Sequence, residues 1–131
     1  MKNKKELYKK LMSVAQKASK NSYSPYSKFK VGCAVLCSNG EIYTGTNIEN
    51  ASYGLSICAE RTAIFNAVSN GNTKIEAVAV YTPYKYVTPC GACRQVISEF
   101  TKNADIIYNS KTDIKITNIK KLLPDSFCRS E

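Results

Sequence analysis

The chain has 131 residues, of which 44% are hydrophobic and 22% charged, and this length and composition predict one domain over residues 1–131. It contains no apolar run long enough to span a membrane, so we expect a cytoplasmic protein that does not bind membranes. The net charge of +9 comes mostly from scattered lysines without an RNA-binding motif or phosphate loop, which favours a solvated basic surface over binding of nucleic acid or anionic metabolites. Histidine is absent, which excludes His-dependent triads and His-ligated metal sites and leaves six cysteines as thiols, metal ligands or nucleophiles.

The N-terminal half is predicted to form a helix followed by a β-hairpin. Apolar residues recur at helical spacing over residues 5–20. A segment rich in serine, with one proline, then interrupts the pattern, and residues 29–37 are predicted to form a strand. An Asn-Gly turn at residues 39–40 leads into the returning strand at 41–48, and residues 50–56 are predicted to form a loop.

The C-terminal half alternates between helices and strands. The expected elements are a helix at 59–69, a strand at 75–82, a helix at 89–100, a strand at 104–110, a last strand at 113–119 and a short helix at 119–123. The strand at 75–82 is almost continuously apolar, which is typical of a central strand covered on both faces. This alternation predicts a layered α/β sheet, antiparallel at one side and parallel where helices intervene.

Glu60 lies on the apolar side of the predicted helix at 59–69. At roughly 100° per residue, four apolar side chains fall within about 80° of it: Ala63, Ile64, Ala67 and Val68. A carboxylate buried there destabilises the fold or takes up a proton. The alternative is that Glu60 reaches solvent from the first turn and only favours the helix dipole.

Three cysteines stand at the starts of the predicted helices. Cys58 directly precedes the helix at 59–69, and Cys90 and Cys93 form a CxxC pair at the start of the helix at 89–100. Two consecutive strand-to-helix units bring neighbouring helix N-termini to one edge of a sheet, so three thiolates would converge over two positive helix ends. The CxxC pair alone is also compatible with dithiol redox chemistry, half of a zinc site or coincidence.

A Zn²⁺ ion held by three cysteines keeps its fourth position for water, which is typical of a catalytic site. Glu60, two residues after Cys58, would exchange protons with that water, and burial would raise its pKa. Arg61 would donate hydrogen bonds to the thiolates, unless it is an ordinary surface arginine. The remaining cysteines are expected to be buried or incidental thiols: Cys33, Cys37 and Cys128.

The C-x-E and P-C-x-x-C motifs, present as CAERTA and PCGACRQVI, form the signature of zinc deaminases. With SPYSKFKVG, GTNIENASYG and LLPDSF, the chain resembles the cytidine deaminases from about residue 23 to 127, in particular their short, homotetrameric, three-cysteine branch. The resemblance implies a three-layer α/β/α fold with a mixed sheet of about five strands and one zinc ion per subunit. It also implies hydrolytic deamination of cytidine and 2′-deoxycytidine in pyrimidine salvage.

The resemblance further assigns roles to single residues. It implies zinc binding by Cys58, Cys90 and Cys93, and proton transfer by Glu60. It implies that Phe29 packs on the pyrimidine and that the backbone of Ala59 contacts the base. Asn47 and Glu49 would bind the ribose hydroxyls. Tyr53 and Phe127 would lie near subunit contacts, and Phe127 would reach the pocket of a neighbouring subunit. Without the resemblance, Phe29 is simply a core aromatic of a strand. Asn47 and Glu49 end a hairpin strand, although their spacing of two places both on one side.

Four other functions stay open at this point. A deaminase of another amino-pyrimidine, such as a nucleoside antibiotic of the blasticidin type, would share the same scaffold. A polynucleotide-editing deaminase would need loops to hold a flipped base, for which the chain is short. Two alternatives belong to other classes of protein. One is a zinc-stabilised RNA-binding module, which needs a fourth zinc ligand, and the other is a thiol oxidoreductase that cycles a Cys90–Cys93 disulfide.

Overall fold

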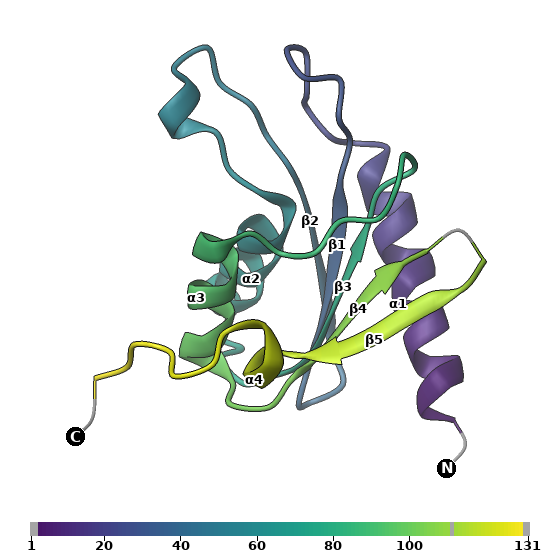
Figure 1. Ribbon diagram of the computed structural model, residues 1–131, viewed down its shortest axis with the longest axis vertical. Coiled ribbons are helices and arrows are strands. Elements are labelled where there is room, and N and C mark those ends of the chain that lie inside the picture. Colours follow the sequence, from purple (N-terminus) through teal and green to yellow (C-terminus); the bar gives the residue numbers. More distant parts are fainter. Residues whose placement is uncertain (1–2, 111, 130–131) are drawn as a thin grey trace.

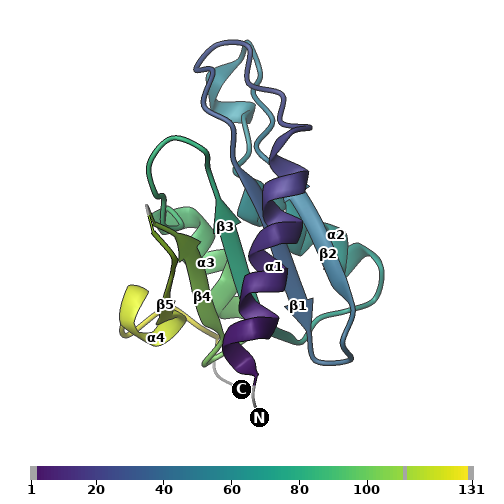
Figure 2. The same cartoon turned by 90° about the vertical axis from the view of Figure 1, so that its right-hand side faces the viewer.

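The computed structural model describes residues 3–110 and 112–129. In chain order the elements are α1 (Lys4–Ser19), β1 (Gly32–Cys37), β2 (Ile42–Thr46), the short 3₁₀ helix η1 (Tyr53–Leu55), α2 (Ala59–Ser69), β3 (Ile75–Tyr81), α3 (Gly91–Phe100), β4 (Asp105–Asn109), β5 (Ile114–Asn118) and α4 (Ile119–Leu122). The strands form one sheet in the order β2-β1-β3-β4-β5, with α1 on one face and α2 and α3 on the other (Figures 1 and 2). The expected three-layer α/β/α architecture is confirmed.

Strand directions follow the predicted alternation. β1 pairs antiparallel with both β2 and β3, and β4 pairs antiparallel with β5. The parallel pair is β3 and β4, which α3 connects. The sheet is therefore mixed, as expected, and its parallel part lies where a helix intervenes.

The helix α1 covers its face of the sheet through residues at helical spacing. Tyr8, Leu11, Met12 and Ala15 are buried on one side of this helix. They pack against alternate residues of three strands: Ala34, Leu36, Ala77, Ala79 and Ile107. The spacing that predicted the helix thus also identified its buried side.

The opposite face of the sheet is covered by α2, α3 and α4. The intervening strand residues point to this side, with Cys33 and Val35 from β1 and Val78 and Val80 from β3 in one core cluster with helix residues. β1 and β3 are therefore buried on both faces, which confirms β3 as a central strand. Helix α2, which begins at the candidate site, belongs to this core.

Helix α2 approaches β2 at backbone distance because Gly45 has no side chain. A Cβ atom at Gly45 would lie 2.3 Å from the backbone N of Ala63 and 2.8 Å from the carbonyl O of Ala59. Neither atom belongs to a flexible side chain, so the contact is rigid. This contact at Gly45 sets the distance between α2 and the sheet near the N-terminal end of the helix.

Two segments differ from the sequence expectation. The predicted loop at 50–56 contains the single turn η1. The strand predicted from residue 29 begins only at Gly32, because Lys28 adopts a left-handed conformation with φ 61° and the following backbone is bound by side chains. Within the described ranges, none of the helices has the length and apolar composition needed to cross a bilayer.

Candidate metal centre and active site

The candidate site lies where α2 and α3 begin. Cys58 is the N-cap residue of α2, Cys90 is the N-cap residue of α3, and Cys93 lies in the first turn of α3. The sulfur of Cys90 accepts a hydrogen bond from the backbone N–H of Cys93 at 3.4 Å. The predicted convergence of the three cysteines over two helix N-termini is confirmed.

The sulfur geometry suits a zinc ion. The three Sγ atoms lie within 4.8 Å of one another, and those of Cys58 and Cys90 are 3.8 Å apart. Tetrahedral coordination with Zn–S bonds of about 2.3 Å requires sulfur separations of about 3.8 Å, so the cluster fits one Zn²⁺ ion. Over the described ranges 3–110 and 112–129, it is the single potential metal-binding group of three or more Cys, Asp and Glu side chains.

The remaining cysteines lie outside this cluster. Cys33 and Cys37 are buried in β1, and Cys128 is exposed near the C-terminus. Burial raises the pKa of both strand thiols, Cys33 more than Cys37. A fourth sulfur ligand from this chain is therefore not in place, which leaves one coordination position available in a tetrahedral site.

Glu60 is buried, with 4% of its surface exposed, on the side of α2 that also buries Ala63, Ile64 and Ala67. This confirms its predicted position on the apolar side, and the alternative of a solvent-exposed glutamate is wrong. Burial raises the pKa of Glu60 to about 7, and the neighbouring charge of Cys58 contributes a smaller rise. A carboxyl with such a pKa can accept and donate protons near neutral pH.

The thiols of the cluster differ in acidity. A hydrogen bond from Cys93, followed by one from Arg61, lowers the pKa of Cys58 to about 5 and overcomes the effect of burial. The pKa of Cys93 is raised instead, chiefly because its thiol donates to Cys58. Arg61 donates from Nη2 to the Cys58 sulfur at 3.5 Å, so the interpretation of Arg61 as an ordinary surface arginine is wrong.

Phe29 and Asn47 lie together at the end of the sheet beyond β1. The Phe29 ring has 36% of its surface exposed. Asn47 donates from Nδ2 to the Phe29 carbonyl at 2.7 Å and accepts from the Val31 N–H at Oδ1 at 2.9 Å. Asn47 therefore fixes the backbone on both sides of Lys30, which holds the segment that carries Phe29.

Glu49 binds the same loop two residues further along. Its Oε1 atom accepts from the backbone N–H groups of Tyr26 at 3.0 Å and Ser27 at 3.2 Å, and Oε2 accepts from the Ser27 hydroxyl. These hydrogen bonds lower the pKa of the carboxyl. Asn47 and Glu49 thus both face loop 22–31, as their spacing of two residues indicates.

The other predicted contact residues occupy different surroundings. Ala59 is buried and opens α2 directly beside Cys58. Tyr53 and Phe127 are 87% and 73% exposed. The carbonyl of Phe127 accepts a hydrogen bond from Gln95 Nε2 at 3.0 Å, which ties the C-terminal segment to α3.

Comparisons with known proteins agree with this arrangement. The family profile described as the cytidine and deoxycytidylate deaminase zinc-binding region matches residues 5–109. The chain belongs to this deaminase family. A curated cytidine deaminase of Sporosarcina psychrophila is 48% identical over 125 residues, covering 93% of this chain and 92% of the relative.

Two further members of the family frame the comparison. A solved cytidine deaminase structure from Burkholderia pseudomallei superposes with a TM-score of 0.85 at 41% identity, covering 91% of this chain and 98% of the other. A blasticidin-S deaminase of Bacillus cereus is 33% identical over 113 residues, covering 79% of this chain and 81% of the relative. The family fold predicted from the motifs is confirmed.

Arg94 supports the site, and the sequence analysis missed it. Its Nε atom donates to the Pro89 carbonyl at 2.7 Å and its Nη1 atom donates to the Leu122 carbonyl at 2.8 Å. One guanidinium thereby joins the segment before Cys90 to α4. The available signal was an arginine directly after Cys93, which does not reveal partners 28 residues away.

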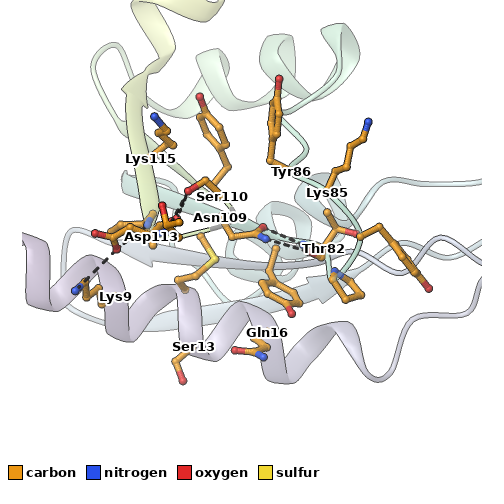
Figure 3. A pocket seen from close by; sticks show the side chains of 17 residues that line it. Lys9, Ser13, Gln16, Thr82, Lys85, Tyr86, Asn109, Ser110, Asp113 and Lys115 are labelled. Atoms are coloured by element: carbon orange, nitrogen blue, oxygen red, sulfur yellow. Dashed lines mark hydrogen bonds and ion pairs between the residues drawn. The ribbon is translucent and has the colours of Figure 1, made fainter.

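One cavity lies away from the cysteines. It has a volume of about 1210 Å³ and opens between α1, the end of β4 and the loop from β3 to α3 (Figure 3). Its walls combine Lys9 and Gln16 of α1 with Tyr86 and Asn109, and they do not include the three sulfur atoms. It is therefore separate from the candidate metal centre.

Proposed function

We propose that this chain hydrolyses cytidine and 2′-deoxycytidine to uridine and 2′-deoxyuridine with release of ammonia. The observation that carries the proposal is the buried Glu60 carboxyl beside three converging thiols, in a chain whose relatives include cytidine deaminases. In the reaction one water molecule is consumed, the bond between C4 and the amino group breaks, and a carbonyl forms at C4.

In this proposal Cys58, Cys90 and Cys93 hold one zinc ion, which supplies the Lewis acidity that makes water a nucleophile at neutral pH. The Glu60 carboxylate accepts a proton from the attacking water. It donates this proton to N3 of the ring, then accepts the second proton of the same water from the new C4 hydroxyl and donates it to the amino group as it leaves. Its pKa of about 7 supports both the acceptance and the donation. Arg61 maintains the thiolate form of Cys58 through its hydrogen bond.

The nucleoside would be bound by the residues around loop 22–31. Phe29 would pack on the pyrimidine, Asn47 and Glu49 would bind the ribose hydroxyls, and the backbone of Ala59 would contact the base. The exposed ring of Phe29 and the position of Ala59 beside Cys58 support this assignment. The amide of Asn47 and the carboxylate of Glu49 supply both donors and acceptors for a sugar.

We further propose a cytoplasmic homotetramer in which residues 1–131 form one catalytic domain with a role in pyrimidine salvage. Tyr53, Leu55 and Phe127 leave 87%, 71% and 73% of their surfaces exposed, and apolar groups of this size favour burial between subunits. Tyr53 and Phe127 would then complete the pocket of a neighbour. The six free cysteines suit a reducing compartment. Sedimentation equilibrium tests the assembly, and a monomer at micromolar concentration would contradict it.

The central test compares Glu60→Gln with a control at an exposed glutamate of α3, Glu99→Gln. Loss of cytidine is followed by ultraviolet absorbance and zinc is measured on the same samples. We expect Glu60→Gln to retain about one zinc per chain and to lose at least about a thousandfold in kcat, and Glu99→Gln to match the wild type. Wild-type turnover by Glu60→Gln would refute the assigned role of this carboxyl.

A second pair of variants separates the other functional classes. Cys90→Ser should lose zinc and turnover together, whereas Cys128→Ser should retain both. A thiol oxidoreductase would instead form a Cys90–Cys93 disulfide and work without metal, and an RNA-binding module would turn over no nucleoside. Because one relative is a blasticidin-S deaminase, blasticidin S belongs in the substrate panel beside cytidine. Turnover of the antibiotic alone would contradict the proposed substrate.

A further inference from the structure

Tyr84 makes two contacts to adjacent residues of the loop that carries Phe29. It lies in the connection between β3 and α3. Its ring stacks on the Phe29 ring with a centroid distance of 5.3 Å and an interplanar angle of 26°. Its hydroxyl donates to the carbonyl of Lys28 at 2.8 Å. One side chain therefore holds both the Phe29 ring and the peptide group that precedes it.

The peptide held by the Tyr84 hydroxyl follows an unfavourable backbone conformation. Lys28 has a φ of 61°, a left-handed conformation that non-glycine residues seldom adopt. Such a conformation persists when surrounding contacts fix it. The Tyr84 hydroxyl is one such contact, and the Lys30 carbonyl is bound in the same way by the Thr82 hydroxyl at 2.9 Å. The connection after β3 thus forms hydrogen bonds to the backbone carbonyls on both sides of Phe29.

The base of this connection is firmly attached to the sheet. Thr82 is completely buried, and its backbone is paired with one side-chain amide (Figure 3). Asn109 accepts from the Thr82 N–H at 3.2 Å and donates to the Thr82 carbonyl at 3.0 Å, which ties the connection after β3 to the end of β4. Tyr84, two residues further on, therefore projects from a fixed point.

We propose that Tyr84 is a positioning residue for Phe29, holding its ring in the orientation that receives the pyrimidine. This inference rests on the proposed function, in which Phe29 packs on the base. The Tyr84 ring supports one side of Phe29 and restricts its rotamers, and the hydroxyl fixes the direction in which the Phe29 backbone leaves Lys28. The tyrosine acts through Phe29 and does not itself touch the reacting atoms.

The first test uses steady-state kinetics with cytidine. Tyr84→Leu removes the stacked ring and the hydroxyl, and Tyr84→Phe removes the hydroxyl alone. Because aromatic pairing and one hydrogen bond each change equilibria by about 2- to 10-fold, we expect KM to rise about 3- to 10-fold in Tyr84→Leu and about twofold in Tyr84→Phe. The kcat should stay within about twofold, since base packing contributes equally before and during the reaction.

Tyr86 provides a matched control in the same loop. It is 59% exposed, compared with 56% for Tyr84, but its ring packs on Tyr108 at 5.6 Å and not on Phe29. Tyr86→Leu should therefore leave KM unchanged. An equal rise in KM for both leucine variants would mean that the loop as a whole responds, and would overturn the proposal.

A double-mutant cycle tests whether the effect passes through Phe29. If it does, Tyr84→Leu has no further effect on KM in a Phe29→Leu background. The same rise in both backgrounds, or a fall in KM in Tyr84→Leu, would overturn the assignment. If Phe29→Leu alone leaves KM unchanged, or if the wild type does not turn over cytidine, it is the proposed function that fails.

A readout independent of activity then decides the question for Tyr84. The chain has four phenylalanines, so protein labelled with fluorophenylalanine gives few fluorine signals, and Phe29→Leu identifies that of Phe29. We expect Tyr84→Leu to shift or broaden the Phe29 signal while the other three stay in place, and Tyr86→Leu to leave it unchanged. A Phe29 signal identical in Tyr84→Leu and the wild type would refute the positioning role.

Discussion

Replacing Gly45 by alanine should displace the catalytic helix without changing any functional side chain. The added Cβ would lie 2.3 Å from the backbone N of Ala63, whereas ordinary contact begins at 3.4 Å. Helix α2 and strand β2 must therefore separate by about 1.1 Å, from 2.3 to 3.4 Å. Neither contacting group can rotate away, so the whole N-terminal part of α2 has to move.

The displacement has two measurable consequences. Overpacking of this kind costs about 1–3 kcal/mol, which corresponds to a urea midpoint lower by about 1 M. A misplacement of about 1 Å at a catalytic group reduces turnover by about 100-fold. Because Cys58 and Glu60 lie at the start of α2, we expect Gly45→Ala to lose activity more strongly than zinc.

The control for this prediction is Gly91→Ala at the start of α3. A Cβ atom at Gly91 would meet nothing within 4 Å, and alanine is the better helix former. Its unfolding midpoint should match or exceed that of the wild type. If Gly45→Ala unfolds at the wild-type urea concentration and retains wild-type kcat, the rigid contact between α2 and β2 does not exist and the reasoning is refuted.

Three further predictions concern buried charge and hydrogen bonding. Tyr8→Phe loses the 2.7 Å hydrogen bond to Asp105 and should be less stable by about 1 kcal/mol at pH 8. Since burial and Asp105 raise the pKa of Tyr8, this difference should shrink in urea titrations above pH 10, where the unfolded tyrosine ionises first, and a constant difference would contradict it. In metal-free protein, the stability of Glu60→Gln relative to the wild type should increase from pH 5 to pH 8, by up to about 3 kcal/mol. The reason is that the folded Glu60 carboxyl has a pKa of about 7, above its unfolded value, so the wild type loses stability as the pH rises through this range. Parallel curves of unfolding free energy against pH for the two proteins would refute this. Arg61→Gln should bind zinc about 10- to 100-fold more weakly in a competition titration with a chelator, because Cys58 loses its donor; an unchanged affinity would exclude that role.

Local patterns predicted the parts of the fold that depend on local chemistry. The spacing of apolar residues identified α1 and the buried side of α2, including the inward position of Glu60. The convergence of Cys58 with Cys90 followed from topology, because successive helices on one face begin at the same edge. The short helix predicted at 119–123 is present as α4, where the Asn118 side chain accepts from the Lys121 N–H.

Contacts between distant segments could not be predicted in the same way. Tyr84 and Lys28 are 56 residues apart, and a tyrosine in a loop carries no signal for a partner at that distance. The left-handed conformation of Lys28 was equally hidden, since such positions usually favour glycine or asparagine. Hydrogen bonds from side chains to backbone carbonyls of other loops form only in the assembled fold. They produce no repeating pattern of residues in the sequence from which they could be predicted.

The three cysteine sulfurs also have a consequence for the denatured chain. Cys58 and Cys90 are 32 residues apart, so an ion shared between them closes a loop that contains all of α2 and β3. A cross-link of that length removes conformational freedom from the unfolded ensemble equivalent to about 4 kcal/mol. The cysteines that form the metal centre thus also stabilise the fold as a cross-link through the ion. A chelator strong enough to abolish turnover should therefore also lower the resistance of this protein to denaturation and proteolysis.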